Sequence, residues 1–295
     1  MIVRSSLPLT SKFLEFSVAS VEAAKELVHR EIDIYSKVKE QLLERYISAD
    51  EIERIRIKRD LEDITSNVRH LNIVDVAMNY LPASQNSEDQ VSDNQEIPSL
   101  EQKTISPHWL DKFNELSRSR NEDWRADLLS RALATESSSP GTVSPRVLWL
   151  LGILEEPLFK AFATILDLCT FIGNERMIPL LGETFMQKPI PNCELGDQVT
   201  IGTLVYILGD IGFLSEQLTT QLSFTQGSEF SVIYDSHHYH IKCSSSPIYV
   251  QGIIPTTLGS SIASFYQPNF NSLGEEIFQA WINSLNKNQF LVTKV

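Results

Sequence analysis

The sequence predicts a mostly α-helical protein that ends in a small α+β module. Three observations lead to this prediction. Residues 19–81 hold few helix breakers and place apolar side chains at helical spacing. Serine–proline pairs at Ser106 and Ser144 mark two further helix starts, because serine caps a helix and proline fits its first turn. After Pro191, short apolar stretches around an Asp-Ser turn favour β-strands.

The N-terminal region, residues 1–82, is predicted to form two long antiparallel helices. These helices form either a helical hairpin or a coiled coil with a partner, because charges of both signs alternate along them. The stretch from Ser48 to Glu51 provides a cap and an acidic first turn for the second helix. Residues 83–105 then predict a disordered acidic linker, since five acids accompany a single lysine and almost no apolar side chain is available for burial.

The central region, residues 106–190, is predicted to be a compact all-helical domain. Apolar side chains at helical spacing indicate which faces are buried. The first helix should bury Trp109 and Phe113, and the next should bury Leu128 and Leu133.

The C-terminal region, residues 191–295, follows the order helix, hairpin, strand and helix. This order predicts a small α+β module that is winged-helix-like, with strands near residues 230–234, 239–243 and 248–254. DNA recognition needs Arg, Lys or Asn contacts to bases and phosphates. From Leu195 to Val295 there are only three lysines against seven acids, so protein interaction is the better use of this module.

Composition bounds the compartment and the class of partner. The net charge of −13 argues against non-specific binding to nucleic acid or to an anionic membrane. Three cysteines, widely spaced and odd in number, favour a reducing cytoplasm, and the N-terminus predicts no signal peptide. The apolar stretch 147–172 is long enough to cross a bilayer, but it contains four charged side chains and a proline. It therefore predicts buried helices and no contact with a membrane.

Four stretches carry a resemblance to a known family. They are Asn72–Pro82 (NIVDVAMNYLP), Asp127–Glu136 (DLLSRALATE), Pro140–Leu148 (PGTVSPRVL) and Leu154–Phe159 (LEEPLF). They resemble an uncharacterised bacterial domain family related to the Abi-alpha abortive-infection proteins. The chain departs from the family pattern at Leu129, where the family has a helical tryptophan. The resemblance implies a bacterial or prophage-encoded cytoplasmic protein of phage defence, and its motifs describe packing without naming a catalytic residue.

A histidine-rich stretch from Asp235 to Cys243 is the best candidate for chemistry. His238 and His240 lie two residues apart, so both rings face the same side of a strand. A histidine pair of this kind can bind zinc, and a four-ligand site would also need Asp235, His237 or a partner chain. The alternative is a polar hairpin tip that binds no metal.

The sequence contains a single basic run, formed by Arg54, Arg56, Lys58 and Arg59. Such side chains can contact phosphate groups or an acidic partner. Several acids lie three or four residues away, so the alternative is a solvated helix face on which the bases pair with these acids.

No hydrolase, phosphate-loop or zinc-protease motif is present in the sequence. Together with the resemblance, this predicts a non-enzymatic interaction or sensor protein of bacterial antiphage defence, with no cofactor unless zinc is bound. The N-terminal helices are expected to bind a protein partner or a second copy of the chain. Two alternatives stay open: an unrecognised enzyme or toxin, such as a metal-dependent nuclease that uses the histidines, and a nucleic-acid-binding regulator that uses the basic run.

Overall fold

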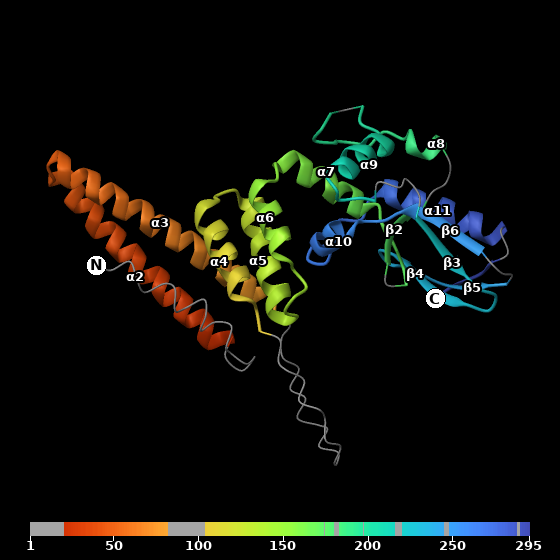
Figure 1. Cartoon of the computed structure of the whole chain (residues 1–295), viewed down its shortest axis with the longest axis horizontal. Coiled ribbons are helices and arrows are strands. Elements are labelled where there is room, and N and C mark those ends of the chain that lie inside the picture. Colours follow the sequence, from red (N-terminus) through yellow and green to blue (C-terminus); the bar gives the residue numbers. More distant parts are fainter. Residues whose placement is uncertain are drawn as a thin grey trace, which may run out of the picture. The chain divides into compact units, whose positions relative to one another are not determined.

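Helices make up the first half of the chain, and an antiparallel sheet occupies much of the second half (Figure 1). The chain forms two compact units, Met1–Ile153 and Leu154–Val295. The computed structural model describes residues 21–81, 104–173, 175–179, 183–196, 198–215, 220–244, 248–287 and 290–295. Of the linker predicted at 83–105, only Thr104 and Ile105 lie within these ranges.

Helices account for all the regular structure described in the first unit. They are α2 (Val21–Ser48), α3 (Glu51–Asn79), α4 (Pro107–Ser119), α5 (Asp123–Ser138) and α6 (Pro145–Ile153). The helix start predicted at Ser106 is confirmed, since its side chain accepts the Trp109 backbone N–H at 3.2 Å. Proline occupies the first turn of α4, as the serine–proline pair predicts.

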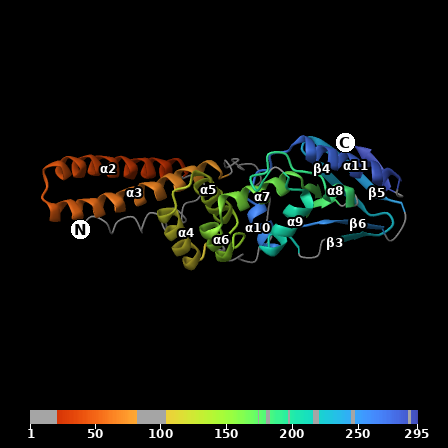
Figure 2. The same cartoon turned by 90° about the horizontal axis from the view of Figure 1, so that it is seen from above.

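Helices α2 and α3 lie side by side and are joined by only two residues, Ala49 and Asp50 (Figures 1 and 2). We call this helix pair the arm. The Asp50 side chain caps α3 by accepting the Glu53 backbone N–H at 2.8 Å. The turn between the two helices points away from α4, α5 and α6 (Figures 1 and 2).

The two halves of α3 are buried to different extents. Seven of its nine buried residues lie after Ser66, where the helix also packs against α4 and α5. In the first half only Ile57 and Ile64 are buried. A pair of helices covers one stripe of each helix, so the rest of the first half of α3 faces solvent.

The core of the first unit comes from the predicted apolar faces. Trp109 and Phe113 of α4 are buried and stack with ring centroids 5.4 Å apart. Leu128 and Leu133 of α5 are buried as predicted. The Ser130 hydroxyl of α5 donates to the Ile73 carbonyl at 2.9 Å and so ties α5 to α3.

The second unit contains five helices and seven strands within the described residues. The helices are α7 (Glu156–Asp167), α8 (Glu183–Met186), α9 (Ile201–Asp210), α10 (Thr257–Ala263) and α11 (Ser272–Lys287). The strands are β1 (Thr170–Ile172), β2 (Glu175–Pro179), β3 (Thr220–Phe224), β4 (Glu229–Tyr234), β5 (His237–Cys243), β6 (Ile248–Ile253) and β7 (Phe290–Lys294). They form one antiparallel sheet in the order β3-β6-β2-β1-β4-β5-β7.

The sheet is larger than the sequence predicts. The three expected strands are present as β4, β5 and β6, but β1 and β2 lie in the stretch predicted to be helical. The prediction of an all-helical region through residue 190 is therefore wrong from Thr170 onward. Strands β1 and β2 are held by distant partners, because Phe171 pairs with Ile233 and Ile178 pairs with Ile253. Short apolar runs do not distinguish strand from helix by periodicity alone.

One face of the sheet is covered by α11. Phe278, Trp281, Ile282 and Leu285 of this helix belong to the same buried cluster as Val232, Tyr234, Ile241 and Cys243 of β4 and β5. Side chains alternate between the two faces of a strand, so residues 238, 240 and 242 lie on the face opposite α11.

The apolar stretch 147–172 is divided among α6, α7 and β1. In the part of the chain that the structure describes, no helix combines the length and the apolar character needed to cross a bilayer.

Candidate functional site

The basic run lies on the first half of α3, near the turn of the arm. Arg54 is engaged within the arm, because its guanidinium donates to the Ile47 carbonyl at 3.4 Å and lies 5.6 Å from the Tyr46 ring centroid. Arg56, Lys58 and Arg59 are exposed. Arg54 therefore supports the turn, and the other three bases face solvent.

The acids near these bases do not pair with them. Within the described residues, no acid lies within 4.0 Å of the cationic groups of Arg56, Lys58 or Arg59, while Glu53 pairs with Arg45 of α2 at 2.6 Å. The alternative of a face of intrahelical ion pairs is therefore not observed at these three positions. These three charges have no ion partner in the part of the chain that the structure describes.

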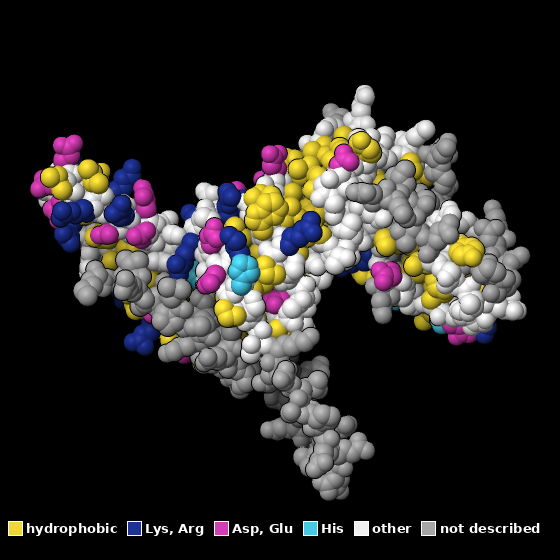
Figure 3. Space-filling model, viewed as in Figure 1, with side chains coloured by type: hydrophobic (Ala, Val, Ile, Leu, Met, Phe, Trp, Pro, Cys, Tyr) yellow, Lys and Arg dark blue, Asp and Glu magenta, His cyan; other side chains and the backbone are white. Residues whose placement is uncertain are grey.

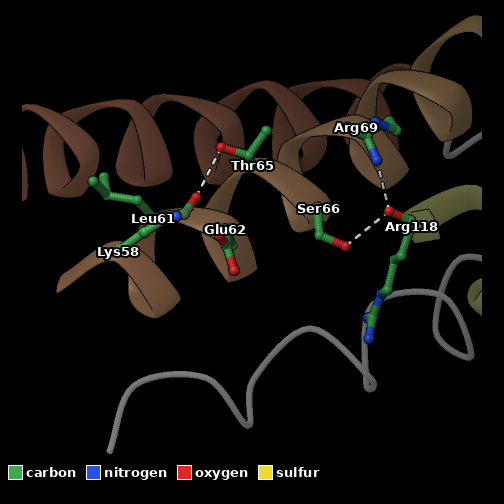
Figure 4. A pocket seen from close by; sticks show the side chains of 7 residues that line it. All are labelled: Lys58, Leu61, Glu62, Thr65, Ser66, Arg69 and Arg118. Carbon is green, nitrogen blue, oxygen red and sulfur yellow. Dashed lines mark hydrogen bonds between the residues drawn. The ribbon is translucent and has the colours of Figure 1, made fainter. Parts of the chain in front are cut away.

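A hollow on the surface of the first unit extends this basic surface toward α4 (Figure 4). Its cavity volume is about 440 Å³, and we call it the α3 hollow. Its lining residues are Lys58, Leu61, Glu62, Thr65, Ser66, Arg69 and Arg118. The Arg118 carbonyl holds two of them in place, since it accepts from the Ser66 hydroxyl at 3.0 Å and from the Arg69 guanidinium at 2.8 Å. Three cations and one acid therefore surround this hollow.

Sequence reasoning missed Arg69 and Arg118. Arg69 follows Lys58 by eleven residues, about three helical turns, so helical periodicity places both on one face. That spacing was a usable signal. Arg118 comes from a different helix, and only the packing of α4 against α3 brings it to Ser66 and Arg69.

The two candidate histidines lie where the strand pattern predicts. His238 and His240 are both on the exposed face of β5, while Ile241 and Cys243 are buried. The His240 ring lies 3.2 Å from a Glu229 carboxylate oxygen of β4, measured from Nε2.

The surroundings of this histidine pair are unfavourable for a cation. Lys242 donates to the other oxygen of Glu229 at 2.7 Å, so an ammonium group already neutralises the nearest carboxylate. His237 lies on the opposite face of β5, which α11 covers, and its ring is 3.1 Å from Glu275 of that helix. Among the described residues, no three His, Cys, Asp or Glu side chains are grouped so as to hold a metal ion.

A half-buried carboxyl group in the second unit joins several elements. Asp167 ends α7, and its Oδ1 accepts from the Tyr266 hydroxyl at 2.9 Å and from the Asn269 backbone N–H at 2.7 Å. The Tyr234 hydroxyl of β4 donates to the Asp167 backbone carbonyl at 3.1 Å. Burial raises the pKa of Asp167 to about 6, in spite of the two hydrogen bonds that favour the charged form. These contacts are structural, because they fix the end of α7.

Asp167→Asn is expected to remove a pH dependence from the second unit. The folded pKa is raised, so the stability contributed by the protonated group is fully present below the unfolded pKa of 3.8 and is lost as pH rises through about 6. Solvent screening of the half-buried group limits this loss to about 1 kcal/mol. Urea unfolding at pH 5 and pH 8 measures it as a difference between wild type and variant. The exposed Asp210→Asn is the matched control, and a difference that does not change with pH would contradict the assignment.

Comparison of the chain with family models, with curated proteins and with solved structures finds no match.

Proposed function

We propose that the protein is a non-enzymatic interaction protein of bacterial antiphage defence whose arm binds a protein partner. The observation that carries the proposal is a cluster of exposed apolar side chains at the turn of the arm. We call this cluster the arm tip, and it consists of Leu43, Tyr46 and Ile47 of α2 with Ile52 and Ile55 of α3. Exposed apolar clusters bordered by polar groups mark interaction surfaces.

The exposure of the arm tip is large. Ile47, Ile52 and Ile55 have 79%, 67% and 68% of their surface in contact with solvent. Hydrophobic side chains lie beside basic and acidic ones at this end of the arm (Figure 3). Burying an isoleucine side chain stabilises a complex by about 1.5–3 kcal/mol before the costs of association, so a partner that covers three of them gains affinity.

The defence context of this proposal comes from the resemblance to the Abi-alpha-related family, as does the cytoplasmic location. We propose a recognition role for the second unit as well. The predicted winged-helix-like module spans α9 to α10, but β3 stands between α9 and β4 along the chain, and β6 pairs with β2 and β3 instead of the β4–β5 hairpin. We propose that this part of the unit contacts protein, because lysines are few there and acids are many.

Charged substitutions at the arm tip test the proposal. Expression of the wild-type chain in a bacterial host is expected to lower phage plating on a broad panel. The double variant Ile47→Glu/Ile52→Glu should lose this protection while keeping the fold, because both side chains are exposed and contribute little to the core. Plating efficiency and circular dichroism are the two measurements.

Leu27→Glu is the matched control, since Leu27 is an exposed apolar residue of α2 that lies away from the arm tip. It should protect like the wild type. Unchanged plating with the wild-type chain across the whole panel would count against the defence role. Equal loss of protection in both variants would count against the arm tip.

A second candidate, a metal-assisted nuclease or toxin, rests on the shared exposed face of His238 and His240, although Lys242 already pairs with the nearest carboxylate. His238→Ala/His240→Ala distinguishes the two functions. Lost activity with an intact fold would favour the enzyme, as would one zinc ion per chain after washing with a chelator. Full phage protection by this variant would favour the interaction protein.

A further inference from the structure

The exposed face of α3 carries charges of both signs, and their order places acids opposite bases when two copies of the helix lie antiparallel. Along this face lie Ile52, Arg56, Arg59 and Asp63, spaced by three or four residues and exposed. The buried residue Ile57 lies on the other side of the helix. Two acids, Glu51 and Glu53, precede the bases in the sequence. Three more acids follow the bases: Asp60, Glu62 and Asp63.

An antiparallel copy of α3 brings these charges together. Consider a two-fold axis that passes between residues 59 and 60 of the two helices. Residues whose numbers sum to 119 then lie opposite each other, so Arg59 faces Asp60 of the second copy and Arg56 faces its Asp63. The two-fold axis repeats both pairs. Four ion pairs therefore form between the two copies. In the described part of a single chain, Arg56 and Arg59 have no acid within 4.0 Å.

The same register brings the start of α3 to the α3 hollow of the second copy. Asp50 faces Arg69, and Glu53 faces Ser66, again by the sum of 119. Both Ser66 and Arg69 line the hollow. The acidic first turn of α3 thus lies level with the cationic hollow of the second copy.

We propose that two copies of the chain associate through antiparallel α3 helices, with Arg56 and Arg59 of each copy paired with Asp63 and Asp60 of the other. This inference rests on the proposed role of the arm as a binding element and names its partner as a second copy. A nucleic acid fits the surface less well, because Asp60, Glu62 and Asp63 repel phosphate groups and the exposed isoleucines contact none.

Two charge-reversed variants of the full chain test the register. The first is Arg56→Glu/Arg59→Glu, and the second is Asp60→Lys/Asp63→Lys. Each variant alone places like charges opposite each other at all four pairs and should be monomeric. A 1:1 mixture restores opposite charges at all four pairs and should form a heterodimer.

Sedimentation velocity measures the outcome, with the wild type expected to dimerise at concentrations on the order of 10 μM. The dissociation constant should rise about tenfold or more between low and high salt, because exposed charge pairs are screened. Lys37→Glu/Lys39→Glu, which reverses two exposed charges of α2, is the matched control and should dimerise like the wild type. Formation of a dimer in the 1:1 mixture would also show that both variants fold.

Three results would overturn the inference: a wild-type chain that stays monomeric up to about 200 μM, variants that each dimerise like the wild type, or a mixture that stays monomeric. These results are separable from failure of the proposed function. A monomeric wild type whose protection against phage is still lost in Ile47→Glu/Ile52→Glu would leave the arm as a binding element for a different protein.

Discussion

Replacing Glu136 with glutamine is expected to lower the free energy of unfolding of the first unit by about 2 kcal/mol, because one of the two backbone N–H groups that its carboxylate accepts loses a charged acceptor. Glu136 lies in the last turn of α5, and its side chain is buried, with 3% of the residue exposed. Its two carboxylate oxygens accept the backbone N–H groups of Gly141 at 2.7 Å and Val143 at 2.8 Å. The amide nitrogen of glutamine cannot accept, so one of the two N–H groups is left unpaired.

Glu136→Ala should cost about 3 kcal/mol or more, because it leaves both N–H groups unpaired and removes buried methylenes as well. Glu115→Gln is the matched control, since Glu115 is exposed on α4 and, within the described part of the chain, pairs with Lys112 alone. Its cost should stay within about 0.5 kcal/mol. Urea unfolding checks all three variants, and equal costs at Glu136 and Glu115 would show that the loop between α5 and α6 does not depend on this carboxylate.

Acid is expected to destabilise the first unit through His70. This histidine is 2% exposed, its Nδ1 lies 2.6 Å from the Ser117 hydroxyl, and its ring meets the edge of Phe113. Burial, helped by the charge of Arg118, lowers the pKa of His70 to about 4. The unfolded chain then binds more protons than the folded one between about pH 6.5 and pH 4. Stability that is present above pH 6.5 is lost as pH falls through this window, by up to about 3 kcal/mol.

His70→Gln should remove most of this dependence while keeping a polar group near Ser117. Other acids titrate in the same range, so the informative quantity is the difference in unfolding free energy between wild type and variant at pH 7 and at pH 4.5. The difference should shrink or change sign on acidification. His108→Gln, at an exposed position of α4, is the matched control. A constant difference would show that His70 binds its proton equally well in both states.

Local signals predicted the helices of the first unit well. Caps and prolines placed the starts of α4 and α6, and helical spacing identified Trp109, Phe113, Leu128 and Leu133 as core residues. These signals work because capping and amphipathic burial involve residues that lie within a few positions of each other.

The sheet was harder to predict because its contacts are not local. Strand β1 pairs with β4 about sixty residues later, and β2 pairs with β6 over a longer separation. Nothing near Phe171 or Ile178 distinguishes a strand from one more helical turn. The burial of Cys169 and Asp167 could not be predicted for the same reason, because it results from packing against residues that are distant in the sequence.

The candidate site shows the same division. The sequence alone placed four bases on one stretch of helix and two histidines on one face of a strand. Only the tertiary structure showed that the bases differ in role. Arg54 supports the arm turn, whereas Lys58 lines a hollow together with Arg69 and Arg118.

The sequence by itself determined the two long helices of the arm, the cap of α3 and the absence of a recognisable catalytic motif, because these depend on neighbours along the chain. Among the described residues, the tertiary structure decided which charges have an ion partner, which isoleucines stay in solvent and which distant arginines meet at one surface. Burial and ion pairing depend on neighbours in space, and these are set only when α3 packs against α2, α4 and α5.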